Sequence, residues 1–137
     1  MPLFDTTFII DLTGAEPGAL RKAERTDEEN VPAALSVLSV HEYLAGVHRK
    51  YGKHSKEMLQ EKLATAHVQI SRFQVIPLTS EIAEVSSGLQ AELMRLGKPI
   101  GINDLYIAAT ALKLDLALVT RNLAEFKQVS KLKLEDY

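Results

Sequence analysis

Three acidic side chains and one amide stand where strands are expected to end or helices to begin. Asp5 follows a short apolar run, Glu42 lies close behind a second run, Asp104 opens an apolar helical pattern, and Asn122 follows a fourth run. In a parallel α/β sheet, ligands bind outside the carboxyl ends of the strands. The spacing therefore predicts that these residues, far apart in the sequence, meet at one edge of a sheet.

Carboxylates that share one pocket raise each other's pKa values unless a cation compensates their charge. Mg²⁺ and Mn²⁺ prefer oxygen ligands, and Mg²⁺ keeps several waters. Such an ion lowers the pKa of a bound water and stabilises charge on a phosphoryl oxygen. Asp5, Glu42 and Asp104 are therefore candidate metal ligands for phosphodiester hydrolysis. The chain has no cysteine and no Gly-x-Ser-x-Gly motif, so it offers no obvious covalent route.

Helix capping is an alternative explanation for each of these residues taken singly. Asp5 could cap a following turn, and Ser39 with Glu42 fits a capping box. Asp104 could complement the positive end of its helix, and Asn122 is a good N-cap residue. Capping is the more common role for any one of them, whereas their joint arrival at one edge favours a site.

Short apolar runs alternate with helical patterns along the whole chain. The expected strands cover residues 2–4, 31–38, 75–78 and 116–119, with a fifth, edge strand at 131–134. The expected helices cover residues 18–29, 39–51, 55–73 and 80–96, the last capped by Thr79 or Ser80, and a further helix contains Asp104. Residues 6–12 fit a helical turn capped by Asp5 better than an extension of the first strand.

This alternation is typical of a parallel sheet that helices cover on both faces. We expect an α/β fold with a central, mainly parallel sheet of four to five strands. A chain of 137 residues is long enough to bury one core. We therefore expect a single domain over residues 1–137.

Composition and charge exclude several other classes of protein. Apolar residues make up 46% of the chain, the net charge is −2, and the absence of cysteine excludes a disulfide framework. The first residues lack the basic segment and cleavage site of a signal peptide. No run approaches the ~20 apolar residues of a membrane span. We expect a cytoplasmic domain with no membrane partner.

Four segments of the sequence resemble, in order, the motifs of the PIN-domain family, and most of all its VapC-type toxins. These segments are DTTFIIDL, SVLSVHEYLAG, GINDLYIAATAL and LALVTRNLAEF. The resemblance implies a PIN-like three-layer α/β/α sandwich and an Mg²⁺- or Mn²⁺-dependent endoribonuclease. It further implies a homodimer, an RNA substrate, and inhibition by a small cognate antitoxin that also binds DNA, as in type II toxin–antitoxin pairs.

The resemblance also assigns roles to particular residues. Asp5, Glu42 and Asp104 match the three core acids that bind metal in the family. Thr6 matches the small hydroxyl residue that follows the first acid, and Thr120 matches the hydroxyl residue of the fourth motif. These two threonines are expected to support the acids.

The fourth motif departs from the pattern of many family members. Asn122 stands where those members have a fourth acid. An amide oxygen can still ligate a metal or orient a water, but it brings no charge, which puts a second metal in doubt. Glu125, three residues further on, is a candidate to replace that acid through a water.

Basic residues in two places could bind the phosphates of RNA. Arg49, Lys50 and Lys53 belong to a segment without acids, whose alternative role is a solvated face. Arg121 stands beside the expected site and is the better candidate for a phosphate clamp. The alternative for Arg121 is an ion pair with a neighbouring acid.

Other functions were weighed against the ribonuclease. A receiver or phosphotransfer domain would need paired acids at the start of the chain, and an Asp-x-Asp phosphatase would need an acid at position 7, where Thr7 stands. The main alternative is a PIN-like module that binds RNA or protein without cutting, which the amide at Asn122 motivates. The three acids at positions 5, 42 and 104 argue against it.

Overall fold

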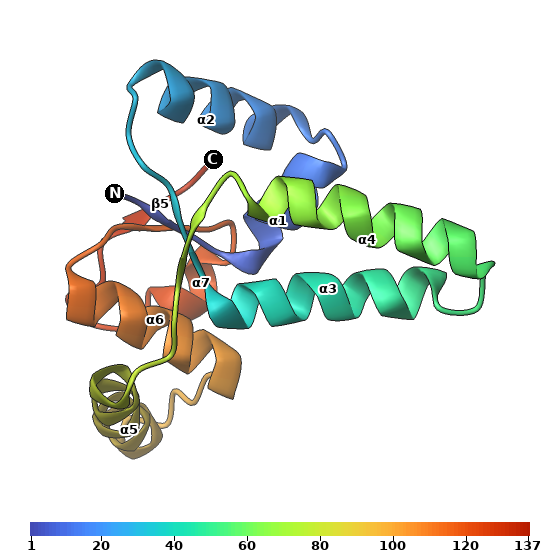
Figure 1. Ribbon diagram of the computed structural model, residues 1–137. Helices are drawn as coiled ribbons and strands as arrows, with labels where there is room; N and C mark the ends of the chain where they lie inside the picture. Colours follow the sequence, from blue (N-terminus) through green and yellow to red (C-terminus); the bar gives the residue numbers. More distant parts are fainter.

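A central, all-parallel sheet organises the computed structural model, which describes residues 1–137 (Figure 1). Its five strands lie in the order β3-β2-β1-β4-β5, so that β1 has a neighbour on each side. The strands are β1 (Leu3–Phe4), β2 (Ala34–Ser36), β3 (Gln74–Ile76), β4 (Leu118–Val119) and β5 (Leu134–Glu135). The predicted α/β fold with a parallel sheet is confirmed.

Seven helices connect and cover these strands. They are α1 (Thr6–Thr13), α2 (Pro17–Glu28), α3 (Val37–Tyr51), α4 (Lys56–Ile70), α5 (Ser80–Arg95), α6 (Ile102–Leu114) and α7 (Leu123–Phe126). Figure 1 shows α2 on one side of the sheet and α5 with α6 on the other. No helix is both long enough and apolar enough to cross a lipid bilayer.

Alternate residues of the strands supply separate cores on the two faces of the sheet, because successive side chains of a strand point in opposite directions. Leu3 and Leu118 pack with residues of α5 and α6. Phe4 and Val119 pack on the other face with residues of α1 and α2. The central strands are therefore buried on both sides, which explains their uninterrupted apolar sequence.

Side-chain caps fix where most of the helices begin. Asp5 accepts a hydrogen bond from the N–H of Thr6 and starts α1, so residues 6–12 are helical, as predicted. Thr79 caps α5, which confirms one of the two predicted caps. The expected start of α3 at Ser39 is wrong, because Ser36 caps this helix three residues earlier. The strand predicted over residues 31–38 contains all of β2 and the first two residues of α3, and hydrophobicity alone does not separate them.

The α3 and α4 helices form a hairpin that extends away from the sheet (Figure 1). Their inner residues make a small core with α1 and β2, centred on Ile9, Leu35, Tyr43 and Ala66. The far end of the hairpin, where α3 leads into α4, is exposed to solvent. This arrangement places the first half of α3 beside the carboxyl end of β2 and its last turn well away from the sheet.

Candidate active site

Asp5 is the buried centre of the site. It follows β1 directly and is 4% exposed. Its Oδ1 accepts a hydrogen bond from the Thr6 N–H at 2.7 Å, and its Oδ2 accepts one from Thr120 Oγ1 at 2.8 Å. Burial raises the pKa of Asp5 above its ordinary value, although these hydrogen bonds partly oppose the shift. The start of α1 and the residue after β4 thus hold the carboxylate in one orientation.

Glu42 reaches the same edge from the second turn of α3. Thr6 Oγ1 donates a hydrogen bond to Glu42 Oε1 at 2.7 Å and also lies 2.9 Å from Ser39 Oγ. Ser39 is fully buried inside the helix, so the predicted capping box of Ser39 and Glu42 is wrong. Glu42 is therefore free to face Asp5, whose pKa its charge helps to raise.

Asp104 lies in the first turn of α6, whose N-cap residue Gly101 provides no side-chain cap. Partial burial raises the pKa of Asp104 to about 7, and the charges of Glu125, Asp5 and Glu42 add to the effect. The positive end of the helix favours a carboxylate at this place. Desolvation and the neighbouring acids act in the opposite direction and give Asp104 its raised pKa. The structure therefore brings Asp5, Glu42 and Asp104 into one electrostatic cluster.

Glu125 is the fourth acid of the cluster, beside Asp104. Asn122 Nδ2 donates a hydrogen bond to Glu125 Oε2 at 2.7 Å, and the Gly101 N–H donates one to Glu125 Oε1 at 3.4 Å. Asn122 occupies the N-cap position of α7, as the capping alternative expected, but its side chain makes no capping hydrogen bond. The fourth carboxylate of the cluster is therefore that of Glu125, and the side-chain amide of Asn122 positions it.

Thr120 joins the two parts of the site. It is fully buried directly after β4, donates its hydroxyl proton to Asp5, and accepts a hydrogen bond from the Asn122 N–H at 2.9 Å. One hydroxyl group thus connects the orientation of Asp5 to the loop that carries Asn122. The supporting positions expected for Thr6 and Thr120 agree with these contacts.

No cation neutralises the four carboxylates. The five ion pairs of the molecule involve other acids, and none includes Asp5, Glu42, Asp104 or Glu125. No three histidine, cysteine or acidic side chains lie close enough together to ligate one ion as they stand. Mg²⁺ is usually bound through only one or two carboxylates, with waters and substrate phosphates completing its shell. The oxygen donors and their uncompensated charge therefore fit such an ion.

Arg121 is turned away from the carboxylates and is already paired. Its Nη2 lies 3.0 Å from Glu16 Oε2, its Nη1 lies 3.9 Å from Asp11 Oδ2, and both Nε and Nη2 donate to the Tyr137 backbone carbonyl. Gly18 makes room for this cluster, because a Cβ at that position would collide with the Arg121 guanidinium. The ion-pair alternative, rather than a free phosphate clamp, describes Arg121 in the structure.

Arg49, Lys50 and Lys53 do not line the carboxylate cluster. They stand at the far end of the α3–α4 hairpin and are exposed. Because a helix rises 1.5 Å per residue, Arg49 is about 10 Å further along α3 than Glu42. Any contact of these residues with a substrate would be separate from the contacts of the acids.

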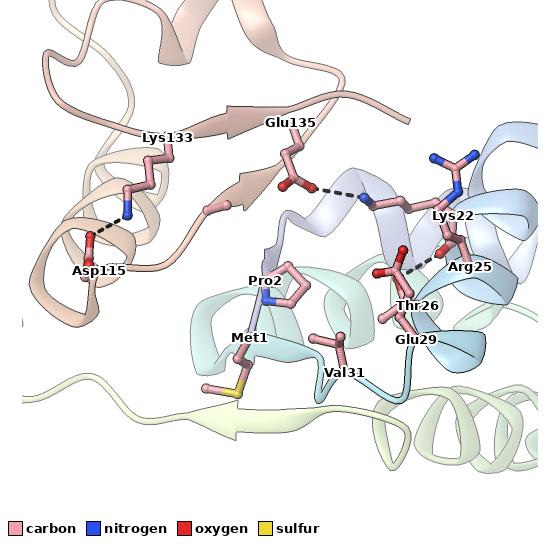
Figure 2. Close-up of a pocket in the computed structure, with 11 residues that line it drawn as sticks. Met1, Pro2, Lys22, Arg25, Thr26, Glu29, Val31, Asp115, Lys133 and Glu135 are labelled. Atoms are coloured by element: carbon pink, nitrogen blue, oxygen red, sulfur yellow. Dashed lines mark hydrogen bonds and ion pairs between the residues drawn. The ribbon is translucent and has the colours of Figure 1, made fainter.

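A hollow of about 480 Å³ lies elsewhere, between α2 and the residues that precede the strands. Figure 2 shows its lining, including Met1, Pro2 and Val31. Its charged groups are largely paired with one another. Lys22 pairs with Glu135 at 3.0 Å and Lys133 with Asp115 at 2.8 Å (Figure 2). This hollow lacks the uncompensated charge found at the carboxyl edge of the sheet.

An uncompensated group of carboxylates at the carboxyl edge of a parallel sheet has the donor chemistry of a metal-dependent nuclease site. The family model described as the PIN domain matches residues 3–132 of the chain. The protein belongs to the PIN-domain family.

The chain is similar in sequence to several nucleases, one of them over almost its whole length. The tRNA(fMet)-specific endonuclease VapC of Shigella flexneri is 29% identical over 135 residues, which are 98% of this chain and 96% of that protein. The ribonuclease VapC2 of Haemophilus influenzae is 34% identical over 87 residues, 64% of this chain and 66% of its own length. The similarity is therefore to proteins named as nucleases.

Solved structures of VapBC complexes share the fold. The VapBC2 complex of Rickettsia felis, bound to a DNA fragment from their promoter, contains a chain that superposes with a TM-score of 0.82 at 28% identity, covering 98% of this chain and 96% of that one. DNA-bound VapBC from Salmonella typhimurium gives a TM-score of 0.84 at 28% identity, covering 99% and 98%. The three-layer PIN-like fold expected from the sequence is confirmed.

Proposed function

We propose that the protein is an Mg²⁺- or Mn²⁺-dependent endoribonuclease, the toxin of a type II toxin–antitoxin pair, which cuts RNA in the cytoplasm. The observation that carries this proposal is the group of four carboxylates without a cationic partner. Membership of the PIN-domain family supports the nuclease class. The names of the VapC relatives support RNA as the substrate.

The residues of the site divide into ligands and positioning residues. Asp5, Glu42 and Asp104 would hold the ion, directly or through waters. A bound divalent ion would supply an activated water and stabilise charge on the phosphate oxygens. Thr6 and Thr120 fix the orientation of the acids through the hydrogen bonds at 2.7 Å and 2.8 Å. Glu42 and Asp5 would thus present their oxygen atoms to the ion with little loss of side-chain conformational entropy on binding.

Glu125 supplies the charge that the amide at position 122 does not. Its carboxylate is held by Asn122 at 2.7 Å, and its charge raises the pKa of Asp104. Asn122 therefore acts as a positioning residue, and Glu125 takes the place of the fourth acid. This arrangement removes the main reason for preferring a module that binds RNA without cutting it.

A small cognate antitoxin and a second copy of the chain are the proposed protein partners. Solved structures that share this fold include two VapBC complexes bound to DNA and a toxin–antitoxin complex from Klebsiella pneumoniae. We infer that this chain is inhibited in the same kind of complex. Purification of the chain expressed with the protein of its neighbouring gene would test both partners through the mass of the complex.

Cleavage of a mixed RNA pool by the antitoxin-free protein tests the function. We expect cutting with Mg²⁺ or Mn²⁺, loss of cutting with EDTA, and loss of cutting in Asp104→Asn, which keeps the size of the side chain but removes its charge. Circular dichroism of the variant controls for folding. A folded wild-type protein that cuts no RNA with either ion would favour the binding module, and full activity of a folded Asp104→Asn protein would remove Asp104 from the site.

A further inference from the structure

The far end of the α3–α4 hairpin carries cations without acidic partners. We call residues 48–56 together with Lys62 the hairpin tip. Arg49, Lys50, Lys53 and Lys56 are exposed, and residues 48–56 contain no acid. None of these cations takes part in any of the five ion pairs of the molecule. The tip is thus a concentrated positive surface on a chain whose net charge is −2.

An aromatic ring holds two of these cations in place. The Nζ atoms of Lys50 and Lys62 lie 5.4 Å and 5.3 Å from the centroid of the Tyr51 ring. The ring attracts each ammonium group through its negative face. The His54 ring lies 5.6 Å from the same centroid. The ammonium groups of Lys50 and Lys62 are therefore held near the same ring, where they repel each other. A bound anion would offset this repulsion, which only solvent screens in the free protein.

The tip has a fixed position relative to the carboxylates. Glu42 and Tyr51 belong to the same helix, α3. With a rise of 1.5 Å per residue, Tyr51 at the tip lies about 14 Å from Glu42 along that axis. At an axial rise of roughly 3.4 Å per nucleotide in a stacked strand, this distance corresponds to about four nucleotides. A strand bound at the carboxylates could therefore reach the tip without bending back.

We propose that the hairpin tip binds the phosphate backbone of the RNA substrate about four nucleotides from the bond that is cut, and so selects long RNA over short fragments. The inference rests on the proposed function for the identity of the polyanion. Charge complementarity favours RNA backbone as the occupant, because lysine and arginine contacts to phosphate need no particular sequence. The nearest acids along α4, Glu57 and Glu61, form no ion pair with the tip cations.

A pair of charge-reversal variants tests the tip. Lys50→Glu/Lys53→Glu alters the tip, and Arg21→Glu/Lys113→Glu makes the same change in net charge on α2 and at the end of α6, where both residues are exposed and unpaired. The affinity for single-stranded RNA of about 4 and about 20 nucleotides is measured in EDTA, so that no cutting occurs. Lys50→Ala/Lys53→Ala is a milder version in case the reversed charges at the end of α3 disturb folding.

We expect the tip reversal to weaken binding of the long RNA by at least ~10-fold, and the control by less than ~2-fold. For the alanine pair, the salt dependence of log K is expected to fall by about 1.4, because two phosphate contacts are lost. Binding of the short RNA, and kcat for its cleavage with metal, should stay unchanged. Equal losses in the tip and control variants would overturn the inference, because they would reflect net charge alone.

The remaining outcomes separate this inference from the proposed function. If the wild-type protein cuts RNA and the tip variants bind long RNA as well as the control variant does, the proposed function stands and the tip is not an RNA-binding site. Tip variants that keep RNA affinity but lose the antitoxin identify the tip as a protein contact and also overturn the inference. A wild-type protein that cuts no RNA defeats the proposed function, and the binding data in EDTA then decide the tip alone.

Discussion

The two ends of the central sheet carry charged side chains that are arranged in opposite ways. Around the hollow of Figure 2, which includes residues that precede β1, β2, β4 and β5, Lys22 neutralises Glu135 at the end of β5, and Lys133 neutralises Asp115. On the side where the strands end, Asp5 and Asp104 have raised pKa values and no cationic partner. Unbalanced charge, rather than open space, therefore distinguishes the proposed site from the other end of the sheet.

Asp5→Asn is expected to have the largest effect on activity, and it is the strongest test of the difference between the two ends of the sheet. The amide still accepts the hydrogen bond from the Thr6 N–H that caps α1, but it loses the negative charge. We expect RNA cleavage to fall by about 10²- to 10³-fold, the range that removal of a central electrostatic group produces. The rate of cleavage of an RNA pool with Mn²⁺ measures the change.

The matching substitution on the other side is Asp115→Asn. Asp115 is exposed and pairs only with Lys133. Cleavage should stay within about 2-fold of wild type, because surface ion pairs contribute little. Comparable losses in Asp5→Asn and Asp115→Asn would mean that the contrast between the two ends has no bearing on activity.

Glu125→Gln is expected to have an intermediate effect. The new side chain can still accept the hydrogen bond from Asn122, so the substitution removes charge and little else. We expect a loss of about 10- to 100-fold in activity or in affinity for Mn²⁺, the usual cost of altering a residue that supports metal ligands. Titration of the cleavage rate with Mn²⁺ distinguishes the two. Unchanged kinetics would show that Glu125 does not replace the fourth acid and would leave Asn122 as the fourth residue of the site.

The raised pKa of Asp104 predicts how the stability of the metal-free protein depends on pH. The folded protein binds a proton at Asp104 with a pKa of about 7, above the ordinary pKa of 3.8 that the carboxyl has in the unfolded chain. The stabilising effect of this proton is therefore complete below about pH 4 and is lost as pH rises through 7. After allowing for solvent screening of this half-buried group, we expect a loss of about 1–2 kcal/mol in unfolding free energy.

Urea denaturation in EDTA at several pH values between 4 and 8 measures this change. Asp104→Asn should flatten the curve and make the metal-free protein more stable than wild type at pH 8, although it is inactive. Mg²⁺ or Mn²⁺ should stabilise wild type most at the high-pH end, because the ion competes with the proton. A variant that shows the same pH dependence as wild type would locate the proton elsewhere.

Lys133→Ala should have the smallest effect, because it removes a fully exposed ion pair. Lys133 and Asp115 have side-chain exposures of 62% and 84%. The melting temperature and the cleavage rate should both stay at their wild-type values within error, because such a pair barely offsets the entropy of ordering its side chains. A clear loss of either would show that the hollow has a role that its paired charges do not suggest.

Much of the fold and the core of the site could be predicted from the sequence. The turn of helix after Asp5 follows from the capping preference of aspartate, and the alternation of strands and helices predicts the parallel sheet. The meeting of Asp5, Glu42 and Asp104 follows from that topology and from the resemblance of the motifs. These features depend on local preferences or on topology rules, both of which a sequence carries.

The remaining features depend on which side chain finds which partner after folding. Ser36 and Ser39 are both good N-cap residues, so the sequence does not decide which of them caps α3. In the structure β2 ends at Ser36, and Ser36 is therefore the cap. Arg121 could face the site or the opposite side, and Glu16 with the backbone of Tyr137 determines the choice. The three-residue spacing of Asn122 and Glu125 was a usable signal, but it also fits a capped helix. Only the observed contact excludes that cap.

The hydrogen bond between Thr120 and Asp5 spans 115 residues, and this has a consequence for when the protein can first act. At a synthesis rate of roughly 5–20 residues per second, the partner of Asp5 is made about 6–23 s after Asp5 itself. The first strand of the sheet has no β4 beside it during that time, and the carboxylates have not been assembled. A growing chain that will cut RNA thus remains harmless to the messenger that encodes it until nearly all of it has been translated.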